Sequence, residues 1–380
     1  MTRVKVAFVL PSLHGGGAER AAVKYLNALD RDRYELTLYL FQREGAYLAE
    51  VGPHVRTVTG TTGGRLHRFV ELRRFLARER FDIVVSFLSH FVVYAAVRAA
   101  GTAARFVISQ QTPVSAFLTD ADYHWRRPAD RALFTAAARA VYPRSDLVVA
   151  ASSGVADDLV THCNVSRPQI AVVPNPVDVD DVERKAAEPV DHDRRDGVPV
   201  IVTAGRLADA KNLPLLVESL RLLRARRGFT AWILGQGELE QDLRARVRAA
   251  GLDDSVTLLG FQVNPWKFMR AADVFVLTSH YEGFGNVLIE AMASGTPVVA
   301  TASFGTRDIV QHERTGLLVE RHAPDAVADA LDRVLGDAAY RARLAAAVRE
   351  RAREFGIERV TAAFASALDR SLQNPGKAAA

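Results

Sequence analysis

Residues 279–290 read Ser279-His-Tyr-Glu-Gly-Phe-Gly-Asn-Val-Leu-Ile-Glu290 and directly follow the apolar run Val274–Thr278. An apolar run, a turn with two glycines and a helical pattern, in this order, predict a strand-turn-helix unit. Glu282 lies in the turn, and Glu290 lies roughly 7–8 Å along a helix that we expect to begin near Gly285, since an α-helix rises about 1.5 Å per residue. The first N–H groups of such a helix can bind phosphate or sugar oxygens. The two carboxylates can accept hydrogen bonds from vicinal diols.

Short β-rich runs alternate with helical patterns along the rest of the chain. We expect strands near 4–10, 35–41, 82–87, 105–109, 146–150, 170–173, 200–204, 230–234, 255–258, 273–277 and 297–300. This rhythm predicts an α/β protein with parallel sheets and crossover helices, and 380 residues suffice for two doubly wound domains. The charged stretch 179–199 has little apolar periodicity and is expected to be a linker. The expected domains are 1–178 and 200–355.

Composition excludes several classes of protein. The single cysteine, Cys163, excludes an internal disulfide framework, and no Cys/His spacing suggests structural zinc. No run approaches the roughly 18–20 apolar residues that a membrane span requires. The N-terminal apolar run is interpreted as a first strand rather than a signal peptide. We therefore expect a cytoplasmic protein.

The positive charge is concentrated in the first half of the chain. Residues 1–178 carry 22 Lys/Arg against 16 Asp/Glu, whereas 179–380 carry 27 against 28. The segment 65–80 has six Arg, two Glu and an apolar stripe. It suits either weak contact with an anionic membrane surface or a solvated helix that packs on its own sheet, and we favour the second. Nucleic acid binding is not expected, because aromatic residues do not interleave with the basic ones.

Two glycine-containing or basic loops follow expected strands. Gly15-Gly16-Gly17 lies between the first strand and a helix, where glycine permits close approach of phosphate or of a sugar acceptor. A merely tight turn is the alternative, since the spacing matches no dinucleotide or Walker motif. Arg206 and Lys211 follow the strand 200–204, where two cations can neutralise a departing diphosphate. By itself this loop could also be an ordinary solvated one.

Together these motifs resemble the retaining glycosyltransferases of family 4. The resemblance is carried by Gly15-Gly-Gly-Ala-Glu-Arg20, Gly205-Arg-Leu with Lys211-Asn, Gly235-Gln-Gly237, and Glu282-Gly-Phe-Gly-Asn with Glu290-Ala-Met-Ala-Ser-Gly-Thr-Pro297. It spans nearly the whole chain. It implies the GT-B fold, in which two Rossmann-like domains face each other across a cleft and a final helix, here 356–374, crosses back to the first domain.

The resemblance also implies roles for individual residues. Arg206 and Lys211 would bind the donor diphosphate and stabilise it as a leaving group, and Glu282 would contact the transferred sugar. Glu290 would hold the ribose hydroxyls. The further nucleotide-sugar-binding residues that it implies are Gly16, Gly17, Gly205, Gly260, Phe284, Gly285 and Asn286.

The first domain departs from the family pattern. Many relatives carry a histidine in a loop after the fourth strand, and Phe106–Pro113 contains none. His14 and His90, each at the end of a first-domain strand, are our candidates on the acceptor side. Gln110 and Gln111 could hydrogen-bond an acceptor or sugar, but glutamine cannot act as a general base.

The sequence therefore predicts a retaining, metal-independent enzyme that moves a hexose or N-acetylhexosamine from a nucleoside-diphosphate sugar to an acceptor hydroxyl, without a cofactor. A UDP-sugar is favoured over a GDP-sugar on family grounds. The expected acceptor is a glycan, lipid-linked or small-molecule hydroxyl in bacterial envelope synthesis, with the enzyme in the cytoplasm or at the inner membrane face. A nucleotide-sugar epimerase, a non-catalytic nucleotide-sugar-binding protein and a peripheral membrane protein remain alternatives. Glycoside hydrolysis would not need the Arg/Lys pair.

Overall fold

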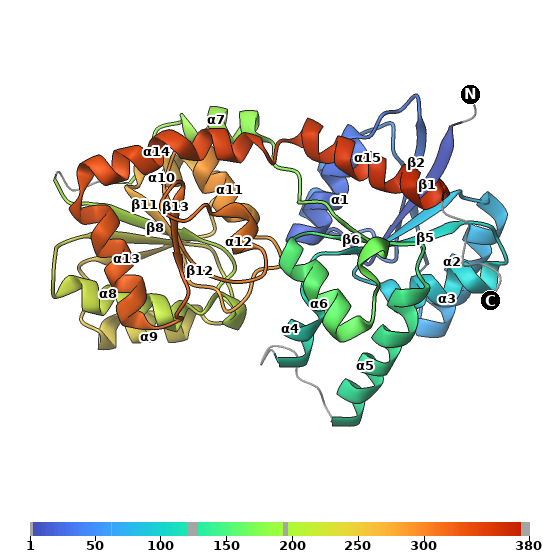
Figure 1. The fold of residues 1–380 in the computed structure, drawn as a ribbon, viewed down its shortest axis with the longest axis horizontal. Helices are drawn as coiled ribbons and strands as arrows, with labels where there is room; N and C mark the ends of the chain where they lie inside the picture. Colours follow the sequence, from blue (N-terminus) through green and yellow to red (C-terminus); the bar gives the residue numbers. More distant parts are fainter. Residues whose placement is uncertain (1–2, 62, 120–127, 193–196, 374–380) are drawn as a thin grey trace. The chain divides into compact units, whose positions relative to one another are not determined.

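The computed structural model describes residues 3–61, 63–119, 128–192 and 197–373, which form two compact units (Figure 1). Unit 1 comprises the described residues of 3–118, 128–176 and 357–373. Unit 2 comprises those of 177–356. The chain passes from one unit to the other near Val177 and again near Gly356, and these two residues form an isolated parallel bridge.

Unit 1 is built on a parallel sheet whose described strands follow the order β3-β2-β1-β4-β5-β6-β7. The strands are β1 Val4–Leu10, β2 Tyr34–Leu40, β3 Arg56–Thr59, β4 Ile83–Phe87, β5 Arg105–Gln110, β6 Leu147–Ala150 and β7 Ile170–Val172. The inner strands β4 and β6 are apolar in nearly continuous runs rather than alternating, because helices cover both faces of a doubly wound sheet. Phe8 and Phe87, stacked at 5.7 Å between ring centroids, lie fully buried at its centre.

Helices and short turns cover the sheet of unit 1. They are α1 Gly17–Ala28, α2 Arg65–Glu79, α3 His90–Ala100, α4 Val114–Thr119, α5 Pro128–Val141, α6 Ser153–Cys163, α15 Ile357–Gln373, and the 3₁₀ turns Ala46–Glu50, Tyr142–Arg144 and Arg167–Gln169. The terminal helix α15, red in Figure 1, packs beside α1, with the Phe364 ring stacked on Tyr25 at 4.1 Å. The last 17 described residues therefore complete the core that the first 40 begin.

Unit 2 has the same architecture with the described strand order β10-β9-β8-β11-β12-β13. The strands are β8 Val200–Ala204, β9 Thr230–Leu234, β10 Val256–Gly260, β11 Val274–Leu277, β12 Val298–Thr301 and β13 Gly316–Val319. The helices are α7 Val179–Ala186, α8 Leu213–Arg224, α9 Glu240–Ala249, α10 Trp266–Ala271, α11 Asn286–Ala293, α12 Thr306–Ile309, α13 Pro324–Gly336 and α14 Ala338–Arg353, with a 3₁₀ turn at Asp209–Lys211. The prediction of two doubly wound parallel-sheet domains is confirmed, and each expected strand is found within two residues of its expected bounds.

The structure corrects one prediction, the linker at 179–199. Its first part is the helix α7, which packs against α10 and α11 of unit 2. Val179, Val182 and Ala186 are buried at helical spacing, while charged residues occupy the remaining positions. Asp178 caps the helix by accepting a hydrogen bond from the Asp181 N–H at 3.0 Å. The many charges therefore belong to the solvated face of an amphipathic helix.

Two strands were not predicted, β3 and β13. Each has only four residues and lies at one edge of its sheet. An edge strand pairs on one side only, so a short run without strong alternation is enough to form it. The predicted last helix, 356–374, is α15, and the final position of that prediction lies outside the described residues.

Candidate active site

The carboxyl ends of β8 and β11 define the candidate site in unit 2. These two strands are neighbours at the centre of the sheet, and the strand order reverses between them. In open α/β sheets a ligand binds beyond the carboxyl ends of the strands at this reversal. Arg206 and Lys211 follow β8, and Glu282 follows β11, so the topology itself brings these predicted residues to one edge.

Close backbone packing fixes the loop after β8. Gly235, at the end of β9, has φ +134°, and a Cβ atom there would lie 1.9 Å from the Gly205 carbonyl oxygen. Only glycine permits both that backbone conformation and that approach. Leu207 adds two hydrogen bonds, donating its N–H to Gln236 O at 2.9 Å and accepting from Leu239 N at 3.0 Å. The loop carrying Arg206 is therefore held rigidly against the next one.

Lys211 and Glu282 form an ion pair across this edge. Lys211 Nζ donates to Glu282 Oε1 at 2.5 Å, and the Ser279 hydroxyl donates to the same oxygen at 2.7 Å. The side chains are 24% and 13% exposed, so the pair is partly withdrawn from water. A charge-assisted bond in such surroundings is stronger than one on an open surface. The structure thus brings two of the three predicted catalytic residues into direct contact.

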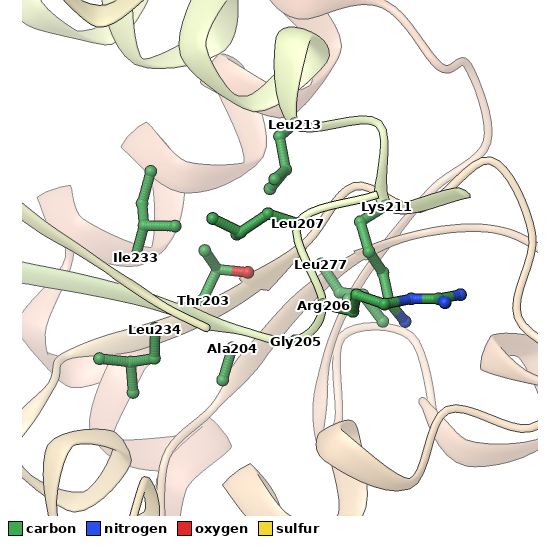
Figure 2. Close-up of a pocket in the computed structure, with 10 residues that line it drawn as sticks. All are labelled: Thr203, Ala204, Gly205, Arg206, Leu207, Lys211, Leu213, Ile233, Leu234 and Leu277. Atoms are coloured by element: carbon green, nitrogen blue, oxygen red, sulfur yellow. The ribbon is translucent and has the colours of Figure 1, made fainter. Parts of the chain in front are cut away.

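Arg206 lies next to this ion pair. Figure 2 shows the Arg206 and Lys211 side chains projecting toward the same side of a small pocket that both line. Arg206 is exposed and forms no ion pair with the part of the chain that the structure describes. The other lining residues are Thr203, Ala204, Gly205, Leu207, Leu213, Ile233, Leu234 and Leu277. The site thus presents an exposed guanidinium beside an ammonium group.

The glycine turn of 282–285 is locked from the loop after β12. Glu282 N donates to Ser303 Oγ at 3.2 Å, and Gly305 N donates to Glu282 O at 2.9 Å. A Cβ atom on Gly305 would lie 2.3 Å from Phe284 Cα. The Phe284 ring is buried and packs edge-on against Phe355 at 5.5 Å, so its side chain belongs to the core. Ser303 and Gly305 were not foreseen, because no motif marks their contact with a turn twenty residues earlier.

Glu290 lies on α11, in a different environment from Glu282. It is 6% exposed, and its Oε2 accepts a hydrogen bond from the Trp266 indole at 3.1 Å. Asn286, at the start of the same helix, has a buried side-chain oxygen without a hydrogen-bond partner in the described chain. Trp266 is a residue that the sequence did not reveal, since its contact with Glu290 exists only in the folded unit.

Gly260 ends β10 at an edge of the sheet. It has φ +67°, and its carbonyl oxygen accepts from Gly235 N at 2.7 Å. Phe261 and Val263, just beyond it, are 66% and 90% exposed. This loop therefore offers apolar surface at the same edge as the charged residues, three strands away from β11.

In unit 1 the glycine loop and His14 lie on the surface after β1. Gly16 precedes α1, Gly17 is its first residue, and no side chain caps this helix start. His14 Nε2 lies 3.3 Å from Glu44 Oε2, and both side chains are more than half exposed. His14 thus has one carboxylate neighbour on an open surface.

His90 and Gln110 belong to a separate, neutral network at the ends of β4 and β5. His90 Nδ1 lies 3.0 Å from Ser86 Oγ, and its ring meets the Tyr142 ring edge-on at 5.7 Å. The Tyr142 hydroxyl donates to Gln110 Oε1 at 2.7 Å. Burial lowers the pKa of His90 to about 4, and a hydrogen bond with Gln110 acts in the opposite direction. The imidazole is therefore neutral near pH 7.

Gln111 makes contacts that are separate from this network. Its amide nitrogen donates to Ser109 Oγ at 3.0 Å, and its Oε1 is buried without a hydrogen-bond partner in the described chain. The structure therefore brings together His90 and Gln110, but it gives no contact that links His14 or Gln111 to them.

Comparison with known families matches both units. Residues 15–181 match the family described as Glycosyltransferase Family 4, and residues 184–351 match Glycosyl transferases group 1. The chain belongs to the family 4 glycosyltransferases. These two matches confirm the family that the sequence motifs predicted.

Curated relatives of this chain are themselves glycosyltransferases. It is 27% identical over 362 residues to the N-acetylgalactosamine-N,N'-diacetylbacillosaminyl-diphospho-undecaprenol 4-alpha-N-acetylgalactosaminyltransferase of Campylobacter jejuni, covering 92% of this chain and 95% of that one. It is 36% identical over 238 residues to the D-inositol 3-phosphate glycosyltransferase of Xylanimonas cellulosilytica, covering 59% and 57%.

Solved structures match the fold of the glycosyltransferase over nearly its full length. HepE of Anabaena in complex with UDP and glucose has a TM-score of 0.77 and 21% identity, covering 97% of this chain and 100% of that one. A glycosyltransferase of Rickettsia africae has a TM-score of 0.80 and 18% identity, covering 98% and 100%. The predicted GT-B fold is confirmed.

Across the described ranges, no helix combines the length and apolar character needed to cross a bilayer. No group of three or more His, Cys, Asp or Glu in those ranges is arranged to hold a metal ion.

Proposed function

We propose that this glycosyltransferase moves a hexose or N-acetylhexosamine from a nucleoside-diphosphate sugar, a UDP-sugar by preference, to an acceptor hydroxyl with retention of anomeric configuration. The observation that carries the proposal is the Lys211–Glu282 ion pair with Arg206 beside it, at the central strand reversal of unit 2. Two cations and a carboxylate at one edge match the two ends of a sugar diphosphate.

The reaction breaks the bond between the anomeric carbon and the diphosphate oxygen, which leaves with the electron pair. A new bond forms from the acceptor oxygen to the same face of that carbon. The acceptor proton passes to the departing diphosphate oxygen, so the products are a glycoside and a nucleoside diphosphate. Arg206 and Lys211 stabilise the negative charge that grows on the leaving group. Glu282 accepts hydrogen bonds from hydroxyls of the transferred sugar.

The Lys211–Glu282 ion pair can be exchanged for contacts with the donor. Before the donor binds, Lys211 neutralises Glu282; when it binds, Lys211 can turn to the diphosphate while Glu282 turns to the sugar. Each group exchanges one charge-assisted hydrogen bond for another, so neither is left buried and unpaired. Arg206, already exposed, gives up no ion pair within the described chain.

The relatives support the substrate class. HepE was solved with UDP and glucose, which supports a UDP-sugar donor for this chain. The Campylobacter jejuni relative acts on an undecaprenol-linked acceptor, which supports a lipid-linked or envelope glycan acceptor. We propose His90 for the acceptor hydroxyls, because its imidazole is neutral and can both donate and accept. Gln110 is buried, with its amide bonded to Tyr142 and Thr112, and would act through this network.

The test replaces each cation. After the donor is identified from a panel of nucleotide sugars by thermal shift, Lys211→Ala and Arg206→Ala are expected to lower kcat for transfer by about 10²–10³-fold, the usual effect of removing one leaving-group or oxyanion contact. Arg221→Ala is the matched control, since Arg221 pairs with Glu218 on the surface of α8 in the same unit. Near-normal transfer by both cation variants would overturn the proposal.

We also propose that no divalent metal is required and that the enzyme works in the cytoplasm, where α2 is a solvated helix packed on its own sheet rather than a membrane contact. That helix buries Leu72, Phe75 and Leu76 but leaves Leu66 75% exposed and Arg78 at its surface. Transfer should persist in EDTA. Flotation with anionic vesicles should show no binding at low salt. Binding at low salt that disappears at high salt, where such attraction is screened, would instead favour contact of α2 with the membrane.

A further inference from the structure

The segment between β10 and α10 is fastened to α7. Asn264 donates from its side-chain nitrogen to Lys185 O at 2.8 Å and to Glu188 Oε2 at 2.9 Å. Pro265 then begins the turn into α10, where its carbonyl oxygen accepts from Met269 N at 3.1 Å. These hydrogen bonds fix the backbone just before Trp266, the first residue of α10, and the first turn of the helix after it.

The Trp266 ring contacts Lys185 of α7 and Glu290 of α11. It is 6% exposed, and Lys185 Nζ lies 5.2 Å from the ring centroid, within the range of a cation–π contact. The indole N–H points to Glu290 Oε2 at 3.1 Å. Ring packing and hydrogen bond together leave this side chain little freedom.

The bond to Glu290 has consequences for a carboxylate that is itself 6% exposed. A buried carboxylate needs hydrogen-bond donors, and a bond to a charged acceptor is stronger than a neutral one. The indole nitrogen donates and cannot accept, so it does not compete with Glu290 for the protons of ligand hydroxyls. Anchoring Oε2 in this way restricts rotation of the carboxylate about its last side-chain torsion.

We propose that Trp266 is a positioning residue that orients the Glu290 carboxylate toward the ribose hydroxyls of the donor. The inference rests on the proposed function, in which Glu290 holds those hydroxyls. Trp266 acts through Glu290 and does not touch the reacting atoms. Its effect should therefore be confined to ligands that carry the ribose hydroxyl pair.

The test compares two nucleotides. Calorimetric titration is carried out with the nucleoside diphosphate that the wild-type enzyme binds best, UDP by expectation, and with its 2′,3′-dideoxy analogue. Trp266→Phe keeps an aromatic ring near Lys185 but removes the N–H and replaces the indole by the smaller phenyl ring. We expect it to weaken binding of the ribonucleotide about 5–20-fold, near the lower end of the roughly 10–150-fold for losing one hydrogen bond to a charged group, because Trp266 acts only through Glu290. Binding of the dideoxy analogue should change less than twofold.

Trp232→Phe is the matched control. Trp232 is fully buried on β9 of the same unit, and its indole N–H has no hydrogen-bond partner in the described chain. Removing that N–H should leave the affinity for both nucleotides unchanged. In a Glu290→Ala background, Trp266→Phe should no longer discriminate between the two nucleotides, because the group through which it acts is gone.

The outcomes separate the two proposals. Equal weakening of both nucleotides by Trp266→Phe would show a general structural role and overturn the positioning role while leaving the proposed function intact. Unchanged binding of both would also overturn it. If the wild-type enzyme binds no nucleoside diphosphate or nucleotide sugar, the proposed function itself fails.

Discussion

The carboxyl edges of the two sheets occupy equivalent places in two similar folds but carry different chemistry. In unit 2 the edge holds the Lys211–Glu282 ion pair and the exposed Arg206. In unit 1 the network at β4 and β5 consists of His90, Ser86, Gln110 and Tyr142, none of which is charged near pH 7. The same topology thus presents charges in one unit and neutral hydrogen-bonding groups in the other.

This difference suggests how the two units divide the reaction. A departing diphosphate needs positive charge nearby. Cations that are already in place need little rearrangement when negative charge develops on the leaving group. A hydroxyl acceptor needs groups that both donate and accept, and a neutral imidazole, an amide and a phenol meet that need. The low pKa of His90 keeps its ring neutral, so under the proposed function it would add no charge beside the acceptor.

Among changes at the unit 2 edge, we expect Gly305→Ala to lower the free energy of unfolding most. The new methyl group would meet Phe284 Cα at 2.3 Å and Phe284 O at 2.4 Å, and backbone atoms cannot move aside as a flexible side chain can. Such overpacking typically costs about 1–3 kcal/mol. We expect this loss in the free energy of unfolding, measured with urea, together with weaker donor binding because the turn carrying Glu282 shifts.

Gly228→Ala is the control for that substitution. Gly228 lies between α8 and β9 of the same unit, and the nearest atom to its added Cβ is Arg224 Nη1 at 3.9 Å. It should change the free energy of unfolding by less than about 0.5 kcal/mol and leave donor binding intact. If Gly305→Ala behaved like Gly228→Ala, the Glu282 turn would not depend on that close packing.

The two edges also differ in how far sequence predicted them. Arg206, Lys211 and Glu282 were predicted to share a site because each follows a strand and the parallel topology brings strand ends together. Ionisable residues beside glycines are conspicuous in a sequence. Glu290 was placed on the correct helix, but its partner Trp266 was not predicted, since the pairing of two helices through an indole leaves no local pattern.

The unit 1 edge was harder to predict for the same physical reason. His90 and Gln110 were proposed individually, but Ser86 and Tyr142 complete their network from other elements and look like ordinary core residues. The helix α7 was taken for a linker because its charges outnumber the three apolar residues that decide its packing. The contacts of neutral residues and of segments with few apolar residues therefore become evident only in the folded structure.

His90→Asn sharpens the comparison from the unit 1 side. The pKa of His90 is lowered from 6.5 to about 4, so between these values the unfolded chain binds a proton that the folded chain does not. The free energy of unfolding therefore falls as the pH drops through this window. Because the side chain is only half-buried, we expect this contribution to be about 1–2 kcal/mol.

The measurement is urea unfolding of the wild type and of His90→Asn at about pH 7 and about pH 5. Asparagine does not titrate, so the variant should lose less stability on acidification than the wild type. Carboxylates that respond to acid are common to both proteins and cancel in the comparison. An equal loss in the two proteins would mean that His90 titrates near its ordinary value and that the edge becomes charged in mild acid.

The smallest expected effect contrasts one ion pair from each unit. Arg33, which precedes β2, pairs with Asp369 of α15 at 2.7 Å. Their side chains are 53% and 32% exposed, against 24% and 13% for Lys211 and Glu282. Water and salt screen an exposed pair, so Arg33→Ala should lower the free energy of unfolding by about 0.2–1 kcal/mol. The difference should vanish in about 1 M salt, where the screening length is about 3 Å. A larger loss that persisted in salt would mean that unit 1 also holds charge firmly, and the contrast between the units would then lie in the position of their charges rather than in how tightly they are bound.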